Sequence, residues 1–522
     1  MQDNKLNLKT IKMLSVLSII ILGSFFIITT KSEYWTHSKR ISFLEMHSAY
    51  PTLAFNNSTL YLAWHTDFGE SSNKTISEIY FTKSIDNGKT WATPTRVTYS
   101  NSYSTYPKLA VENNTIHLVW VDDRDGNEEI YYKKSINGGK TWSNDTRLTY
   151  ARGSSIRPSI TVYHKNVHIV WMDYRFFGSE IYYKVSRDNG DNWSNDTRLT
   201  YDDTPSYRPS IATNGKNIYV VWQDHRSGSK FEIYYKISKD GGLTWEKTTR
   251  LTYAQVEAEW PVVAAYDKNV HVAWVDKRDG NPEIYYKRST DEGLTWSKDV
   301  RLTSNNNIST NLFITVNRNT VYVVWADDRN GNFEVYYKIS RDNGKTWSDD
   351  IRLTFNKGAS HHPCLVVSNI DGKLHFVWDD NRDNKNKCEI YYKQINNTPP
   401  LITNISISKK ENKIYVYGFD MEDNKSDLIC NIYYILPNGS KTMLKAKFKS
   451  SHWEAPLNNF QNLFPITYTI EAELIDSQGI YNRNFTSVRR NRNVTPSFQL
   501  LLFLLSIILI IIFKKYNKAS FD

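Results

Sequence analysis

Cysteine is scarce in this chain. Only three of its 522 residues are cysteines, namely Cys364, Cys388 and Cys430. A small and odd number excludes a scaffold held together by many disulfides. Cys364 and Cys388 fall in one repeat of the sequence, and two interpretations stay open for them: a disulfide, or two small buried hydrophobic residues.

Several signatures of catalysis and of nucleic-acid binding are also absent. No Ser–His–Asp system, phosphate-binding loop or zinc cluster has a matching motif, so no metal or cofactor is expected. The formal charge of +10 is not arranged as a basic stripe interleaved with aromatic residues, which argues against nucleic acid as a partner. The charge instead favours anionic glycans, acidic polymers or phospholipid headgroups.

Long apolar runs occur only near the two ends of the chain. Met13–Thr29 follows several lysines, and Phe498–Phe513 precedes a basic tail. Such runs with basic flanks predict membrane segments, with the middle of the chain on the extracellular side of the cell membrane. Frequent Asn-x-Ser/Thr sequons agree with a glycoprotein. The expected segments are a cytoplasmic tip with a signal peptide or signal anchor over 1–30, a transmembrane helix over 496–513 and a basic cytoplasmic tail over 514–522.

Tryptophan, by contrast, is abundant and regularly placed. Fourteen of the sixteen tryptophans form two series with a step of roughly 51 residues, and a period of this size indicates a repeat architecture. Each repeat reads as an apolar run ending in Trp-x-Asp, a turn, Glu-Ile-Tyr-Tyr-Lys, then Ser-x-Asp-x-Gly-x-Thr-Trp and Arg-Leu-Thr. The first series is Trp64, Trp120, Trp171, Trp222, Trp274, Trp325 and Trp378, and the second is Trp35, Trp91, Trp142, Trp193, Trp245, Trp296 and Trp347.

Each repeat predicts four short antiparallel strands, because turn residues separate alternating runs and no helical period is present. Such sheets arranged radially form a β-propeller, and the seven tryptophans of the first series predict seven blades over 31–397. The last repeat lacks its fourth strand, whereas Trp35–Phe43 has the sequence of one. This N-terminal strand is therefore expected to complete the seventh blade and leave no open edge. In the repeat of Trp222 the expected strands are 208–213, 217–223, 232–238 and 249–253.

The pattern changes after the pair Pro399-Pro400. Alternating runs over 398–490 predict a small β-sandwich similar to immunoglobulin-like or fibronectin type III modules, and 491–495 is a polar linker. The expected fold class is therefore all-β: a seven-bladed propeller of four-stranded blades, a small sandwich, and apolar membrane segments at both ends.

The motif Ser-x-Asp-x-Gly-x-Thr-Trp occurs at five places in register, one of them with Asn192 in place of the threonine, and at a sixth place with Asn137 in place of the aspartate. This motif is the Asp box of bacterial neuraminidase repeats, and residues 35 to about 395 resemble the sialidase superfamily. Its Asp can accept backbone N–H groups, its Gly can take a positive φ and its buried Trp can pack against the neighbouring sheet, so we interpret it as structural. The resemblance implies that these turns lie on the face opposite the ligand site.

A second repeated group is charged. An Asp follows six of the seven Trp residues of the first series by two residues, with Asp67 three residues after Trp64. An Arg follows that Asp in the same six blades, and a Glu lies at the start of each third strand. We expect these groups to form a ring of bidentate pairs between neighbouring blades. The acidic run 123–129 is similar to a calcium loop, but its glycine is misplaced, which favours ordinary turn chemistry over a metal site.

Function in such a ring requires departures from the repeat. The residue before the proline of each first strand differs from blade to blade, and these residues should surround the mouth of the central channel. Aromatic rings can stack on sugars, and arginines can hold a carboxylate. The expected ligand-binding residues are Arg157, Arg208, Trp260, Tyr50, Tyr106 and His362, with Asn311 at the same place in the blade that lacks the proline.

The sialidase resemblance further implies three arginines on the substrate carboxylate, a Tyr–Glu pair and an acid. The chain departs from this pattern, because proline directly follows Arg157 and Arg208, whereas the family has Arg-Ile-Pro. The other arginines recur in blade after blade, as structural residues would. Glu257 and Glu259 are the only acids nominated for catalysis.

These observations predict a membrane-anchored cell-surface propeller that binds a glycan or a surface protein at the channel mouth without catalysis. Two alternatives stay open at this point. One is a sialidase-like exo-glycosidase, and the other is a structural component of a cell-surface layer.

Overall fold

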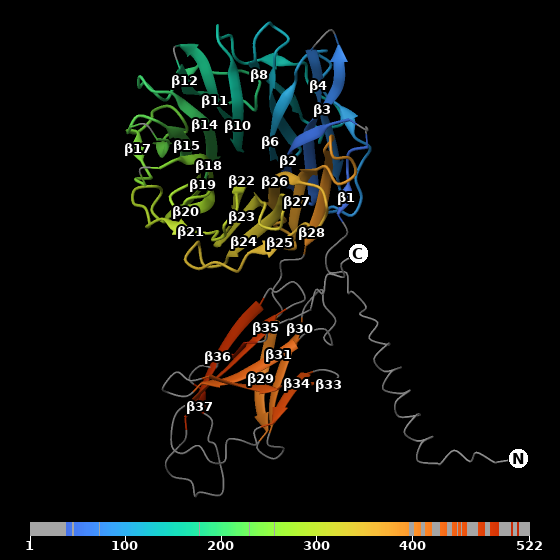
Figure 1. The fold of residues 1–522 in the computed structure, drawn as a ribbon, viewed down its shortest axis with the longest axis vertical. Coiled ribbons are helices and arrows are strands. Elements are labelled where there is room, and N and C mark those ends of the chain that lie inside the picture. The colour runs from blue at the N-terminus through green and yellow to red at the C-terminus, as the bar shows by residue number, and fades with distance from the viewer. Residues whose placement is uncertain are drawn as a thin grey trace, which may run out of the picture.

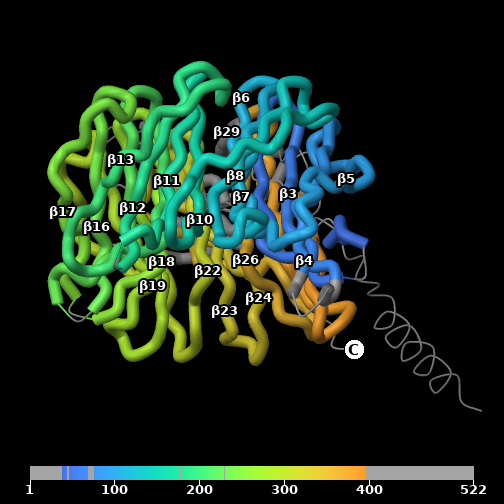
Figure 2. Tube along the Cα trace, turned by 90° about the horizontal axis from the view of Figure 1, so that it is seen from above, coloured from blue at the N-terminus to red at the C-terminus, as the bar shows by residue number. Residues whose placement is uncertain are grey.

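A computed structural model of the chain describes residues 38–395, with gaps at 44–45, 72–73, 177, 229 and 255, and beyond residue 400 the strands alone. Residues 38–395 form seven four-stranded antiparallel sheets around a common axis (Figure 1). The first strands of the chain lie beside the last ones of the ring in the view turned by 90° (Figure 2). The prediction of a seven-bladed propeller is confirmed.

The blades follow one another along the chain. Blade 1 consists of β2 (Ser48–Asn56), β3 (Thr59–Ser71), β4 (Lys74–Ser84) and β5 (Thr95–Arg96). Blade 2 consists of β6 (Thr105–Glu112), β7 (Thr115–Asp122), β8 (Glu129–Ser135) and β9 (Thr146–Arg147). Blade 3 consists of β10 (Ser155–Tyr163), β11 (Asn166–Phe176), β12 (Gly178–Ser186) and β13 (Thr197–Arg198). Blade 4 consists of β14 (Ser206–Thr213), β15 (Ile218–Asp224), β16 (Glu232–Ser238) and β17 (Thr249–Arg250).

The remaining blades repeat this order. Blade 5 consists of β18 (Ala258–Tyr266), β19 (Asn269–Asp276), β20 (Glu283–Ser289) and β21 (Val300–Arg301). Blade 6 consists of β22 (Ser309–Asn317), β23 (Thr320–Asp327), β24 (Glu334–Ser340) and β25 (Ile351–Arg352). Blade 7 consists of β26 (Ser360–Val367), β27 (Leu374–Asp380), β28 (Glu389–Ile395) and, from the other end of the chain, β1 (Lys39–Arg40).

The N-terminal strand closes the ring as predicted. β1 pairs antiparallel with β28, and the N–H of Ile41 donates to the carbonyl of Ile390 at 2.7 Å. Arg40 and the hydroxyl of Ser42 both donate to the carboxylate of Glu389. The inner strand β2 of blade 1 also contacts β26 of blade 7. Blade 7 therefore has no unpaired outer edge at β28.

The core lies between the blades. Val119 and Val121 of blade 2 pack with Ile169 and Trp171 of blade 3 in one buried cluster. The indole Nε1 of Trp171 donates to the carboxylate of Asp173 at 2.9 Å, so this large side chain is buried with its polar atom satisfied. All seven tryptophans of the first series are fully buried: Trp64, Trp120, Trp171, Trp222, Trp274, Trp325 and Trp378. Each therefore fixes one blade against its neighbour.

Lysines also link neighbouring blades. Lys133, at the end of Glu-Ile-Tyr-Tyr-Lys in blade 2, donates to the carbonyl of Val97 in blade 1 at 2.6 Å. This contact satisfies a backbone acceptor beyond the short fourth strand. In five further blades the lysine at the same position donates to a backbone carbonyl of the preceding blade. These lysines are Lys184, Lys236, Lys287, Lys338 and Lys393.

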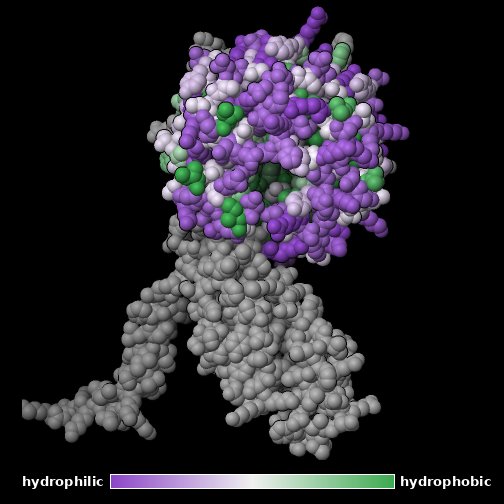
Figure 3. Space-filling model, turned by 180° about the vertical axis from the view of Figure 1, so that it is seen from behind, coloured by the Kyte–Doolittle hydropathy of each residue, from purple (hydrophilic) through white to green (hydrophobic). Residues whose placement is uncertain are grey.

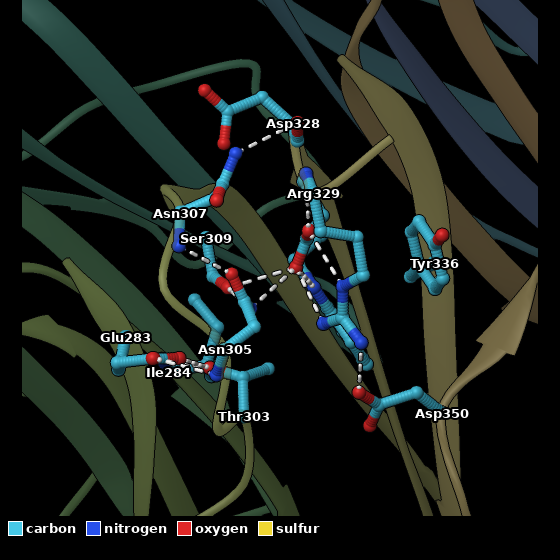
Figure 4. Close-up of polar contacts among 12 residues, drawn as sticks. Glu283, Ile284, Thr303, Asn305, Asn307, Ser309, Asp328, Arg329, Tyr336 and Asp350 are labelled. Carbon is cyan, nitrogen blue, oxygen red and sulfur yellow. Dashed lines mark hydrogen bonds and ion pairs between the residues drawn. The ribbon is translucent and has the colours of Figure 1, made fainter. Parts of the chain in front are cut away.

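The expected ring of carboxylate–guanidinium pairs between blades is wrong. Arg329 binds both oxygens of Asp327 in its own blade, at 2.7 and 2.6 Å, and also Asp350 of that blade at 2.6 Å (Figure 4). The side chains of residues i and i+2 face the same side of an extended chain, so the arginine reaches its own aspartate first. The link between blades is smaller: Asn305 donates to Glu283 of blade 5 at 3.0 Å and to Asp327 of blade 6 at 3.3 Å.

The Asp boxes have the expected structural contacts. Asp188 accepts the N–H of Asn192 at 2.8 Å, and Gly190 has a φ of 85°. A Cβ on Gly190 would lie 1.9 Å from the hydroxyl oxygen of Tyr132 in the preceding blade. Trp193 packs edge-on against the same Tyr132, with ring centroids 5.0 Å apart. One detail differs from the expectation, because Trp193 is half-buried rather than buried.

Beyond residue 400 the strands form two antiparallel sheets. Most of these strands lie within 398–490, whereas β37 and β38 lie within 496–513, where a transmembrane helix was expected. The immunoglobulin-like or fibronectin-like identity of the module stays a prediction. One sheet has the order β29 (Leu401–Ser408), β30 (Lys413–Phe419), β34 (His452–Pro456) and β33 (Lys447–Lys449). The other has the order β32 (Lys441–Lys445), β31 (Ile429–Ile435), β35 (Tyr468–Ile475), β36 (Tyr481–Arg489) and β37 (Phe503–Leu504), and β38 (Leu509–Ile510) also pairs with β36.

Two expectations about the ends and the cysteines can be compared with the described residues. No helix within them has the length and apolar character needed to cross a membrane. Met13–Thr29 lies outside the described residues, as does most of 496–513, so the membrane segments stay predictions. Cys364 and Cys388 both carry free thiols, so the two residues do not pair.

The closing strand should matter as much as any internal one. Ile41 is 3% exposed and packs in the cluster of Trp64 and Tyr392, and Leu199 is its counterpart in blade 3. Ile41→Ala and Leu199→Ala should each lower the free energy of unfolding by about 2–5 kcal/mol, since each leaves a cavity. Urea unfolding followed by tryptophan fluorescence measures both, with the exposed Lys39→Ala as control. An Ile41→Ala protein as stable as the parent would show that the ring does not depend on this strand.

The Asp boxes should also contribute to acid sensitivity. Hydrogen bonds from Ser289 and Thr295 lower the pKa of Asp291 to about 2. The pKa in the unfolded chain is about 3.9, so this contribution to stability is present above about pH 4 and is lost as the pH falls toward 2. Asn137 accepts the equivalent N–H, from Thr141 at 2.9 Å, without a charge.

This pair of boxes provides reciprocal variants. Asp291→Asn should retain the thermal midpoint near pH 7 and make its fall between pH 4 and 2 less steep, whereas Asn137→Asp should make that fall steeper. Calorimetry across this pH range tests both. If the thermal midpoint falls equally steeply between pH 4 and 2 in the parent and in both variants, the Asp boxes do not cause the acid sensitivity.

Candidate functional site

A cavity of about 360 Å³ lies on the propeller axis and is lined by the inner strands of all seven blades. The face of the ring in Figure 3 is mostly hydrophilic and is hollowed at its centre, where the walls are apolar. The structure brings together, in the lining of this cavity, all seven residues that the sequence places at the mouth: Tyr50, Tyr106, Arg157, Arg208, Trp260, Asn311 and His362.

These seven residues share an unusual backbone conformation. Each has a φ between 45° and 56°, in the left-handed region that glycine favours, although none of them is glycine. The register of every inner strand shifts at the same point, for example between Ile156 and Ser159 in blade 3. A bulge of this kind turns a side chain away from the direction that a regular strand would give it. Bulky residues in this conformation store strain, which is concentrated at functional sites in many proteins.

Arg157 and Arg208 are adjacent at the mouth and stack on aromatic rings. The guanidinium carbon of Arg157 lies 4.4 Å from the centroid of Tyr106, and that of Arg208 lies 4.0 Å from the centroid of Trp260. Neither guanidinium forms a hydrogen bond or ion pair with any described residue. Burial, together with the charge of Arg157, lowers the pKa of Arg208 to about 10. Two half-buried cations side by side, neither of them hydrogen-bonded to an acid, favour an anion that joins them.

A third cation lies in the same cavity. Lys108 follows Tyr106 by two residues on β6 and lines the cavity, and the surrounding protein lowers the pKa of its amine. The described residues that line the cavity include no aspartate and no glutamate. The cavity is therefore electropositive, and it suits an anionic ligand.

The other side of the mouth has a different chemistry. His362 Nδ1 lies 2.9 Å from the carboxylate of Asp379, which is buried behind it. The same carboxylate accepts the N–H of Tyr50 at 3.2 Å. The rings of Tyr50 and His362 are in contact, with centroids 3.9 Å apart and planes tilted by 31°. Burial opposes ionisation of Asp379, but the neighbouring His362 and His361 keep the pKa of its carboxyl group below the usual value.

A second pocket of about 340 Å³ shares Arg157, Arg208 and Trp260 with the axial cavity. It extends between blades 3 and 4, where Tyr174 and Tyr207 line it. A ligand longer than one sugar unit can therefore pass from the axis toward the rim without leaving the two arginines.

The two acids nominated for catalysis already have partners. Glu257 lies 3.3 Å from Lys230 and accepts the N–H of Phe231, and it is not among the lining residues of either pocket. Glu259 lines the second pocket and pairs with Lys277 at 2.9 Å. Both acids therefore stabilise loops, and neither stands in the axial cavity.

Sequence reasoning missed Asp379 and Lys108, although the repeat contains a signal for each. The residue after the buried Trp is apolar in four blades, but it is His65, Gln223 or Asp379 in the other three. At the position of Lys108 the other blades carry uncharged residues that are either small or apolar, and the largest of them is Phe313. An alignment of the repeats that compared every position, and not only the residue before the proline, would have found both Asp379 and Lys108. No cluster of potential metal ligands occurs among the residues that the structure describes.

Comparison with known proteins now identifies the type of propeller. The sequence profile described as "BNR repeat-like domain" matches residues 159–376. The chain carries a BNR-repeat propeller. No curated protein is significantly similar to the chain in sequence.

Solved structures similar to the BNR propeller are distant. The polysaccharide lyase Uly1 is 10% identical, with a TM-score of 0.47 over 68% of this chain and 91% of the lyase. Trypanosoma rangeli sialidase in complex with 2,3-difluorosialic acid is 10% identical, with a TM-score of 0.42 over 93% and 94% of the two chains. A neuraminidase-like protein from A/bat/Guatemala/164/2009 is 10% identical, with a TM-score of 0.39 over 57% and 90%. The function of the BNR propeller therefore has to be argued from its own residues.

The unpaired state of Arg208 leads to a stability prediction. Arg208→Met should raise the free energy of unfolding by up to about 2 kcal/mol, since it removes a desolvated cation that faces Arg157 and retains an apolar stem for packing on Trp260. Arg329→Met is the matched control, and it should cost about 3–5 kcal/mol because Asp327 would be left buried and unpaired. Chemical unfolding at low salt measures both. Equal destabilisation by the two variants would show that Arg208 is a structural residue.

Proposed function

We propose that the BNR propeller binds an acidic glycan at the mouth of its central channel, with a carboxylate of the glycan held between Arg157 and Arg208. The observation that supports this proposal is the contrast between these two arginines and the other arginines of the ring. The arginines of the Trp-x-Asp-x-Arg motifs bind carboxylates in their own blades: Arg124, Arg175, Arg226, Arg278, Arg329 and Arg382.

The shape and lining of the mouth favour a sugar over a small inorganic anion. A cavity of about 360 Å³ is within the range of small-molecule sites. Trp260 and Tyr106 supply flat apolar faces beside the two cations, which suits a ring that carries both C–H groups and a carboxylate. The apolar runs near both ends of the chain support a membrane anchor with this ligand site outside the cell, and this location is part of the proposal.

Recognition is better supported than hydrolysis of the sialidase type. Hydrolysis of the sialidase type uses a tyrosine paired with a glutamate, together with an acidic residue. The axial cavity has no such pair among the described residues that line it. The proposal therefore assigns Arg157 and Arg208 to binding and assigns Glu257 and Glu259 to the stability of the loops.

Isothermal titration of the full-length protein with acidic glycans tests the proposal. Oligosaccharides that contain uronic or sialic acid should bind, and their neutral counterparts should not. Arg157→Ala and Arg208→Ala should each weaken binding by roughly 10- to 150-fold, the worth of a hydrogen bond to a charged group. Lys345→Ala removes one positive charge from an exposed Asp-box turn on the opposite face and should change nothing.

Equal affinity for neutral and acidic glycans, or unchanged affinity in both arginine variants, would contradict the proposal. Turnover of a fluorogenic sialoside that either arginine variant abolishes would instead establish the sialidase-like alternative. The two outcomes are distinguishable because the first is read from binding and the second from released fluorophore.

A further inference from the structure

The departures from the repeat divide the channel mouth into two chemically different halves. Blades 3 and 4 supply the two arginines, whereas blades 7 and 1 supply His362 and Tyr50, with Asp379 behind them. A chain of ring contacts connects the halves: 3.9 Å from His362 to Tyr50, 4.5 Å from Tyr50 to Tyr106, and 4.4 Å from Tyr106 to the guanidinium of Arg157. A sugar whose carboxylate binds the arginines therefore extends toward the histidine.

Asp379 fixes the orientation of the His362 ring. The carboxylate of Asp379 accepts the proton on Nδ1, so the lone pair of the neutral imidazole is on Nε2. Nε2 has no partner among the described residues, and the ring is about a quarter exposed, on the side of the cavity. A buried carboxylate that orients a histidine while its other nitrogen faces the ligand is the arrangement used for proton transfer.

Tyr50 lies against His362 and keeps its phenolic proton at neutral pH. Burial and the neighbouring Tyr106 raise the pKa of its phenol well above the usual value, so the hydroxyl keeps its proton at neutral pH. The N–H of Tyr50 is fixed by the same Asp379 that orients His362. One buried carboxylate therefore positions both the proton acceptor and the proton donor.

We propose that the mouth of the BNR propeller cleaves a uronic acid-containing glycan by β-elimination, with His362 as the base and Tyr50 as the acid. This inference rests on the proposed binding of a glycan carboxylate by Arg157 and Arg208. Binding of the carboxylate by two cations stabilises the negative charge that develops next to it, which makes the hydrogen on the neighbouring carbon, C5, easier to remove.

The step balances without a metal, an oxidant or water. His362 Nε2 takes the proton from C5, and the electron pair of that C–H bond forms a double bond between C4 and C5. The bond between C4 and the glycosidic oxygen breaks, and that oxygen takes the proton of the Tyr50 hydroxyl. The imidazolium of His362 then returns its proton to the phenolate of Tyr50, directly or through solvent, which restores both groups.

The test uses the full-length protein with polygalacturonate, alginate and hyaluronan as probes. Elimination produces an unsaturated uronate, which is detected by ultraviolet absorbance and by a product mass that lacks the water added in hydrolysis. His362→Gln and Tyr50→Phe should lower kcat roughly 10²- to 10⁴-fold, while the affinity from calorimetry stays within about threefold. Asp379→Asn should lower kcat with KM retained, because Asp379 is a positioning residue. Lys345→Ala is the control.

Each outcome decides between the two proposals. Unsaturated products that His362→Gln and Tyr50→Phe suppress, with binding retained, support elimination. Binding of an acidic glycan without any unsaturated product overturns elimination and leaves recognition intact. Products that carry an added water overturn it in favour of hydrolysis. Absence of binding to every acidic glycan overturns the proposed function and elimination together. Thermal unfolding of each variant shows whether it is folded.

Discussion

The structure depends on one repeated interaction, the burial of a tryptophan between two blades with its indole N–H bound to an aspartate two residues later. In blade 3 this is Trp171 with Asp173, and Arg175 completes the group by binding the same carboxylate. The contact joins apolar burial to a satisfied polar network, so it specifies both the packing and the register of the blade. Six blades carry this contact, and in blade 1 the indole of Trp64 donates to the hydroxyl of Thr66 instead. Together with the strand pair β1–β28, these contacts close the ring.

A frame this regular leaves the axis free for function. The residue at the start of each inner strand takes a left-handed backbone conformation in all seven blades, so the frame fixes where the side chain points while its identity varies. Two neighbouring blades carry arginines there, and two others carry histidine and tyrosine. The result is an asymmetric mouth on a symmetric support, with cations on one side and a proton-transfer pair on the other.

Most of the fold could be predicted from the sequence because its signals are local and repeated. The period of the tryptophans gave the number of blades, and the missing strand in the last repeat revealed the closure by residues near Ile41. The pairing of Arg329 was predicted wrongly, because a repeat shows which residue types recur but not whether partners lie in one blade or in two. The half-burial of Trp193 likewise depends on how far one sheet covers the next.

The site was predictable in part for a related reason. The residue before the proline of the first strand varies between repeats and was expected to face the channel. Residues at this position, such as Arg157 and His362, could therefore be named from the sequence alone. Asp379 could not be connected to His362, because the two belong to different strands and only the antiparallel pairing of β26 with β27 places them together. The absence of a partner for Arg208 is likewise a property of the fold, since no sequence pattern shows which charges stay unpaired.

A crystal structure of the protein with a bound uronic acid oligosaccharide tests the central claim most directly. The account predicts a carboxylate within hydrogen-bonding distance of both Arg157 and Arg208, with C5 of the same sugar directed toward Nε2 of His362. A ligand bound on the Asp-box face or at the outer strands, with the two guanidinium groups still unpaired, would contradict it.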